Sequence, residues 1–192
     1  MGPAVGSLAV LRRRKTPDDP LAHVDPGATS PRFAPAVAEA LESRRRYREL
    51  VDGLRPGPVR DRLERTQERL DAGVLAVWDT AVRATEIERT LATLDPERVT
   101  AEYKRAKRAG DEPDVEAALG QRFMSVQRLL NTLDDTDDRL RLLDARLGAA
   151  VAQAAEVALD VAGPSAADAL DAELAGVVDD LAALRSALDE LG

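Results

Sequence analysis

The longest regular pattern in the chain is a seven-residue repeat of apolar positions in its second half. Its first set consists of Leu119, Val126, Leu133, Leu140, Leu147, Ala154 and Val161. A second set lies between these positions and consists of Val115, Arg122, Leu129, Thr136, Leu143, Ala150 and Val157. Two interleaved sets of this kind form the a and d positions of a heptad repeat, which give a helix one apolar seam. The pattern predicts a helix over residues 114–162, about 72 Å long at 1.5 Å per residue.

A weaker repeat of the same period precedes it and predicts a helix over residues 58–94. Its first set consists of Leu63, Leu70, Val77, Ala84 and Leu91, and Gly73 and two threonines weaken the interleaved set. Asp95 and Pro96 interrupt the repeat, because the residue before a proline disfavours helical geometry. Asp95 can then cap a separate helix over 96–109, and the alternative is one helix kinked at Pro96.

Shorter apolar patterns predict two further helices, over residues 35–54 and 165–191. Since residues 58–109 and 114–162 have similar lengths, they can form antiparallel arms joined by the turn AGDEP. The expected fold class is therefore all-α. It is an elongated antiparallel coiled-coil hairpin whose flanking helices form a bundle at its base, with a thinner two-helix stalk near residue 110.

The first 30 residues differ from the rest because they contain four prolines and no sustained period. Such a composition is typical of a segment that cannot bury enough apolar surface to fold. We therefore expect a flexible, disordered N-terminal arm over residues 1–30 and one helical domain over residues 31–192.

Composition adds constraints on the core and on the compartment. Hydrophobic residues make up 44% of the chain and aromatic residues only 3%, so the core consists mainly of Leu, Val and Ala. The absence of cysteine excludes disulfides and thiolate metal sites. No apolar run reaches 18 residues, and the N-terminal apolar stretch precedes its basic residues, the reverse of a secretory signal. We expect a cytoplasmic protein, and 24 arginines against 3 lysines indicate a GC-rich bacterial gene.

Charge is distributed unevenly along the chain. The net charge is −8, and residues 164–192 contain 7 acidic side chains against 1 basic side chain. Because nucleic acid binding requires an extended basic surface, we expect no nucleic acid partner.

The acidic run DDTDD, residues 134–138, is the first candidate site. In the heptad register Asp134, Asp135 and Asp138 point outward, and Asp137 flanks the seam. A calcium site needs a curved loop with alternating ligands, whereas this run lies within a continuous predicted helix. We interpret it as a solvated helix face, with Asp135–Arg139 and Asp137–Arg141 as local pairs. Thr136 then occupies a polar position in the seam, where it can set the register.

The basic run ESRRRYREL, residues 42–50, is the second candidate. Arginines at this density can hold phosphate or anionic lipid. Local pairing at i,i+4 explains most of them, through Glu42–Arg46, Arg45–Glu49 and Arg48–Asp52. Arg44 is the arginine left without a partner.

Two further basic clusters are candidate contact surfaces. Tyr103, Lys104, Arg105, Lys107 and Arg108 lie where the hairpin is expected to turn, and we predict a partner-binding surface there. Cations near a helix C-terminus also stabilise the helix itself, which is the simpler interpretation. Arg12, Arg13, Arg14 and Lys15 in the arm form a weaker candidate for contact with an anionic surface.

Catalytic chemistry has little support in the sequence. The only histidine, His23, lies in the expected arm. A Ser-His pair and a histidine-bearing di-iron centre are therefore not expected, and no glycine-rich phosphate loop follows a strand. We expect a protein that is not an enzyme and that has no cofactor and no metal site.

The function that this pattern favours is a coiled-coil scaffold or adaptor that presents a helical stalk to a protein partner. We expect a homodimer, since apolar seams on slender helices are buried best among several helices. The long hairpin also resembles the architecture of the phage-shock-protein-A and ESCRT-III group. That resemblance covers the hairpin alone and implies the alternative, a peripheral membrane-surface stress or remodelling protein. Contact with a membrane surface is the less favoured of the two.

Overall fold

The computed structural model describes residues 19–110, 112–159 and 166–190, and the described residues are helical with no strand among them. The helices are η1 (Pro26–Ala28), α1 (Ala34–Asp52), α2 (Pro58–Leu94), α3 (Pro96–Ala109), α4 (Pro113–Ala158) and α5 (Ala166–Asp189). This confirms the expected all-α class. The apolar position Val161 lies outside the described residues.

Pro96 separates α2 from α3 and does not merely kink one long helix. The backbone of Asp95 adopts a left-handed conformation with φ of 52°, the only positive φ among the described non-glycine residues. The Asp95 carboxylate accepts a hydrogen bond from the backbone N–H of Arg98 at 3.1 Å, which caps the start of α3. The sequence left open two separate helices or one helix kinked at Pro96, and the structure has two separate helices.

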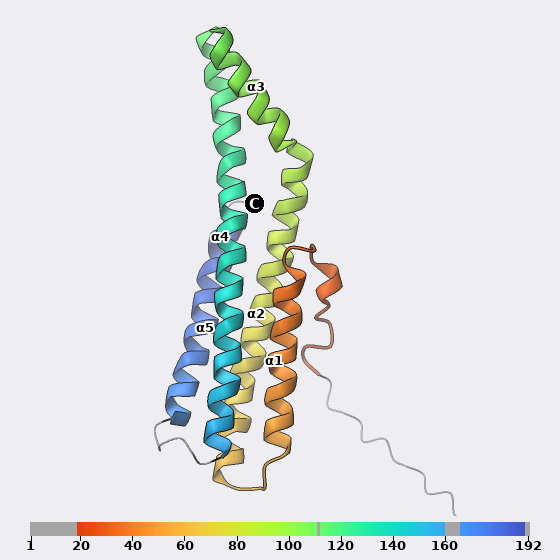
Figure 1. Cartoon of the computed structure of the whole chain (residues 1–192), viewed down its shortest axis with the longest axis vertical. Coiled ribbons are helices and arrows are strands. Elements are labelled where there is room, and N and C mark those ends of the chain that lie inside the picture. Colours follow the sequence, from red (N-terminus) through yellow and green to blue (C-terminus); the bar gives the residue numbers. More distant parts are fainter. Residues whose placement is uncertain (1–18, 111, 160–165, 191–192) are drawn as a thin grey trace, which may run out of the picture.

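The helices alternate in direction along one long axis (Figure 1). α1 runs toward the base, α2 runs back and α3 continues to the far end, from which α4 returns to the base and α5 rises beside it. α1 and α5 each pack against both α2 and α4, so these four helices form a bundle. α3 packs against the outer part of α4, and we call these two segments, residues 96–109 and 113–130, the stalk.

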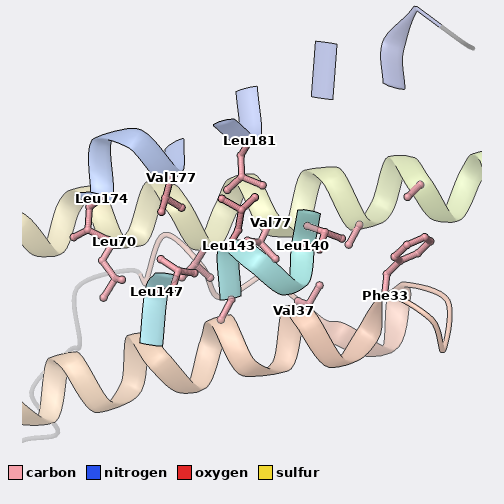
Figure 2. Packing of buried hydrophobic residues seen from close by; sticks show 14 of the residues in the cluster. Phe33, Val37, Leu70, Val77, Leu140, Leu143, Leu147, Leu174, Val177 and Leu181 are labelled. Atoms are coloured by element: carbon pink, nitrogen blue, oxygen red, sulfur yellow. The ribbon is translucent and has the colours of Figure 1, made fainter. Parts of the chain in front are cut away.

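The core of the bundle follows the heptad positions of α4. Leu140, Leu143 and Leu147 of α4 point toward side chains of α1, α2 and α5, as Figure 2 shows. The seam of α4 is buried at Val126, Leu133, Thr136, Leu140, Leu143, Leu147, Ala150 and Ala154. Toward the stalk the seam emerges into solvent, because two helices cannot cover it as four do. Val115 is 46% exposed there.

The buried threonines of the core satisfy their hydroxyl groups within their own helices. Thr80 and Thr85 donate to carbonyls four residues back in α2, each at 2.8 Å, and Thr136 does the same in α4 at 2.7 Å. A hydrogen bond of this kind satisfies the buried hydroxyl group within its own helix, so the hydroxyl needs no partner on a neighbouring helix. Thr136 therefore does not set the register through a hydrogen bond to a neighbouring helix.

Residues 19–30 pack on the bundle, which corrects the expected end of the N-terminal arm at residue 30. Leu21 is only 4% exposed and belongs to the core, and the backbone N–H of Ser30 donates to the Thr85 hydroxyl at 2.9 Å. Asp19 forms an ion pair with Arg44 at 2.6 Å. The buried Leu21 and these polar contacts hold the segment against the bundle, and the proline-rich composition gives no sign of them. Residues 1–18 of the expected arm lie outside the described residues.

Candidate interaction site at the end of the stalk

An aromatic pair attaches α3 to α4 at the outer part of the stalk. The rings of Tyr103 and Phe123 stack with centroids 4.9 Å apart and planes 19° apart. Gly120 lies against this pair, since a Cβ there would come within 3.4 Å of Tyr103 Cε2. Arg122 of α4 also pairs with Glu102 of α3 at 3.2 Å. Together these contacts fix which face of α3 turns outward.

The outward face of α3 carries the cations that the sequence analysis singled out. Lys104, Arg105, Lys107 and Arg108 are all exposed. Among the described residues no carboxylate lies within ion-pair distance of any of them, and Arg108 Nε donates instead to the carbonyl of Lys104 at 3.1 Å. Four cations within five residues therefore create a local positive surface on a protein whose net charge is −8.

Tyr103 has a different place from the four cations. Its ring is half-buried against Phe123, and Lys107 Nζ lies 6.0 Å from the ring centroid. The Tyr103 ring therefore holds α3 against α4. The same ring also lies beside the Lys107 ammonium group. The sequence pattern brings these five residues to one helix but does not reveal that the tyrosine is mainly a packing residue.

A groove runs along the same helix. It has a volume of about 500 Å³ and is lined by Pro96, Glu97, Thr100, Ala101, Lys104 and Arg108 of α3 and by Leu130 of α4. Glu97 and Leu130 were not predicted from the sequence. The spacing of Glu97, Ala101, Lys104 and Arg108, at four, three and four residues, was the available signal, because it marks a single helix stripe.

The acidic run on α4 is a surface of ion pairs. Asp134 pairs with Arg32 at 2.6 Å, and Asp137 pairs with Arg141 at 2.7 Å. The expected pair Asp135–Arg139 is not formed in the described structure. Within the described ranges no group of three His, Cys, Asp or Glu side chains could hold a metal ion.

In the basic run on α1, the structure corrects the expectation that Arg44 has no partner. Arg44 is not left over, since its side chain is only 9% exposed and binds two carboxylates, Asp19 at 2.6 Å and Asp71 at 2.7 Å. The hydrogen bond from Arg44 lowers the pKa of Asp19 to about 2 against the opposing effect of desolvation. Sequence reasoning missed this network because the two carboxylates lie 25 and 27 residues from the arginine.

The remaining arginines of that run take local or neighbouring partners. Arg46 pairs with Glu42 at 2.9 Å and Arg45 pairs with Glu49 at 2.7 Å, as expected. Arg48 approaches Asp19 at 3.7 Å, and the predicted pair with Asp52 is not formed among the described residues. This cluster is therefore occupied by its own carboxylates.

Two other sequence candidates contribute no described site. Arg12, Arg13, Arg14 and Lys15 lie outside the described residues. His23 is exposed on the segment that precedes η1. None of the helices described here is both long enough and apolar enough to cross a lipid bilayer.

The chain was compared with protein-family models, with curated proteins and with solved structures, and none of these comparisons gives a match.

Proposed function

We propose that this protein is a non-enzymatic scaffold or adaptor of the cytoplasm, whose bundle is a rigid body and whose stalk is the docking element. In this proposal α2 and α4 form an antiparallel coiled-coil hairpin, and the chain works as a homodimer. The partner is a protein that contacts the outer end of α3 through Lys104, Arg105, Lys107 and Arg108, with Tyr103 holding that helix in place.

The observation that carries the proposal is the pairing state of the cations. Elsewhere on the molecule many arginines lie within ion-pair distance of a carboxylate, as Arg44, Arg45 and Arg146 do. The four cations at the end of α3 have no such partner among the described residues. Charges that a fold leaves unpaired at a projecting end are available to steer and orient an acidic partner.

The proposal is tested by position-specific photo-crosslinking in the native host. A photoreactive amino acid replaces Lys107 at the end of the stalk or, as the control, the exposed Ala152 near the base of α4. We expect a protein adduct of defined mass at position 107 and not at 152. The adduct should disappear when Lys104, Arg105 and Arg108 are changed to glutamate, in a variant whose helicity and thermal midpoint match the parent.

Absence of an adduct at position 107, or an adduct that survives the charge reversal, would refute the docking role. Sedimentation with phosphatidylserine vesicles addresses the membrane-surface alternative. Binding that requires the same cations, together with no protein adduct, would replace the adaptor proposal by that alternative.

A further inference from the structure

The groove on α3 carries opposite charges at its two ends. Glu97 lies near the start of the helix and Lys104 lies two turns later on the same stripe, about 10 Å away along the axis. Between them the helix presents only the small side chains of Thr100 and Ala101, and Leu130 of α4 supplies apolar surface. The groove is therefore acidic at one end, lined by small side chains in the middle and basic at the other end.

The charged residues at the two ends of the groove, Glu97 and Lys104, take part in no ion pair within the described residues. The adjacent Arg98, by contrast, approaches both Asp95 and Glu102. Such an exposed helix stripe has an anion at one end, a cation at the other and small residues between them. It is therefore complementary in charge to an antiparallel copy of itself.

We propose that this groove is the contact surface between two copies of the chain. The two α3 helices cross antiparallel, with a two-fold axis passing close to Thr100 and Ala101. Because Glu97 and Lys104 are equally far from that axis, Glu97 of each copy faces Lys104 of the other, and the pair forms twice. The small residues at the centre allow the two helices to approach closely, and Leu130 of each copy loses contact with water.

The charge order favours a second copy over a peptide of uniform charge. An acidic peptide along the groove would meet Glu97, and a basic peptide would meet Lys104 and Arg108, so each is repelled at one end. The antiparallel copy is attracted at both ends. This inference rests on the homodimer in the proposed function and names its surface. Lys104 and Arg108, which the adaptor proposal also uses, then lie in the interface between copies, and Arg105 and Lys107, which do not line the groove, remain for the adaptor contact.

A charge-reversal exchange tests the inference directly. Glu97→Lys places two cations opposite each other twice across the interface, and Lys104→Glu does the same with two anions. We expect each variant to raise the dimer dissociation constant at least about tenfold in sedimentation equilibrium at low salt. An equimolar mixture of the two variants should form a heterodimer, because both facing pairs are then attractive. The double variant Glu97→Lys/Lys104→Glu should regain the parental homodimer.

Arg105→Glu is the matched control, since it reverses one charge on the next residue of α3 outside the groove. It should leave the dissociation constant unchanged within about twofold, because rim charges contribute little.

Thermal melts followed by circular dichroism identify any variant that fails to fold. In that event crosslinking of Ala101→Cys provides the test in a chain that has no other cysteine. A short bis-maleimide should join two copies through position 101 and not through Arg105→Cys.

The outcomes separate this inference from the proposed function. A parental dimer that neither single variant weakens, or a mixture that forms no heterodimer, would overturn the groove as the interface while leaving the homodimer in place. A parental chain that stays monomeric up to high micromolar concentration would overturn both the homodimer and this surface. The adduct at position 107 is read separately, because an adduct with a second copy has twice the mass of the chain, whereas an adduct of any other mass reports the adaptor partner.

Discussion

At the scale of single residues, the heptad register separates side chains that maintain the core from those that face water. Leu140 is fully buried between α1, α2 and α5, whereas the side chain of Asp138, two residues earlier, is 78% exposed. A shift of the register by one residue would turn different side chains inward. The contrast between these two nearby positions is therefore a sharper test of the fold than the stability of either variant alone.

Leu140→Ala should lower the free energy of unfolding by about 2–5 kcal/mol, because it removes buried methyl groups and leaves a cavity. Asp138→Ala should change it by no more than about 0.5 kcal/mol, as exposed substitutions usually do. Urea melts of the two variants give both values. Equal and small effects would show that the assigned register is wrong.

The ion pair of Asp19 with Arg44 predicts a dependence on pH. A carboxyl whose folded pKa is lowered to about 2 stabilises the fold above its unfolded value near 3.8, and this contribution disappears as the pH falls through 2. Asp19→Asn should therefore destabilise the protein at neutral pH. Since the Asp19 side chain is 38% exposed, solvent screening limits the effect to about 1 kcal/mol.

The measurement is a series of urea melts of parent and Asp19→Asn from pH 7 to pH 2. The difference in stability should stay constant down to about pH 5 and shrink progressively between about pH 5 and pH 2. Asp52→Asn, at an exposed site at the end of α1, is the control for loss of a surface carboxylate and should change the stability at neutral pH by no more than about 0.5 kcal/mol. A deficit of Asp19→Asn that persists unchanged at pH 2 would mean that the charge on Asp19 is not what holds the segment.

At the scale of the elements, two glycines within the long helices are positions where a substitution is expected to increase stability. Gly73 lies on the buried face of α2, where the heptad pattern places a weak point, and a Cβ there would lie 3.5 Å from Leu147 Cδ2 and 3.8 Å from Val177 Cγ1. These are ordinary van der Waals distances. Gly148 lies on the exposed face of α4 with nothing within 4 Å of such a Cβ.

Both Gly73→Ala and Gly148→Ala should raise the free energy of unfolding by up to about 1 kcal/mol, since alanine is the better helix former. Gly73→Ala should gain slightly more, because its methyl group also fills space between α4 and α5. Thermal unfolding of the two variants gives the comparison. Destabilisation by Gly73→Ala alone would indicate that the three helices approach more closely than described.

The elements also show what the sequence could and could not predict. The seven-residue repeat predicts α4 because burial of one stripe on a long helix leaves a regular signal in the sequence. The contacts of Arg44 and Arg32 leave no such signal, since their carboxylates lie far along the chain and meet them only after the helices pack. The same holds for Leu130, which lines the groove only because α3 leaves α2 at Pro96 and crosses toward α4. The basic end of α3 was visible from the sequence, and the groove beside it was not.

At the scale of the whole molecule, the fold places a stalk beyond a four-helix bundle. The bundle contains nearly all the buried leucines. The stalk depends on fewer contacts, among them the stacked rings of Tyr103 and Phe123, the pair of Arg122 with Glu102 and the buried side chains of Val99, Ala106 and Val126. A thin projection with unpaired charges is suited to contact with other molecules, whereas the bundle is suited to hold it in a fixed direction. Both proposals for this protein require that the stalk stand clear of the bundle.

The distance from the end of the stalk to the base of the bundle tests that requirement most directly. The chain has no native cysteine, so spin labels can be placed uniquely at Lys107→Cys and Gly148→Cys. Labelled protein is diluted with unlabelled protein to suppress distances between copies.

The expected distance follows from the packing of α3 against α4. Since Tyr103 lies beside Gly120, position 107 is level with about residue 116 of α4. The separation along α4 is then about 50 Å at 1.5 Å per residue. A narrow distribution centred near that distance in double electron–electron resonance is the predicted result. A distribution centred below about 30 Å, as for an α3 folded back onto the bundle, would contradict the account.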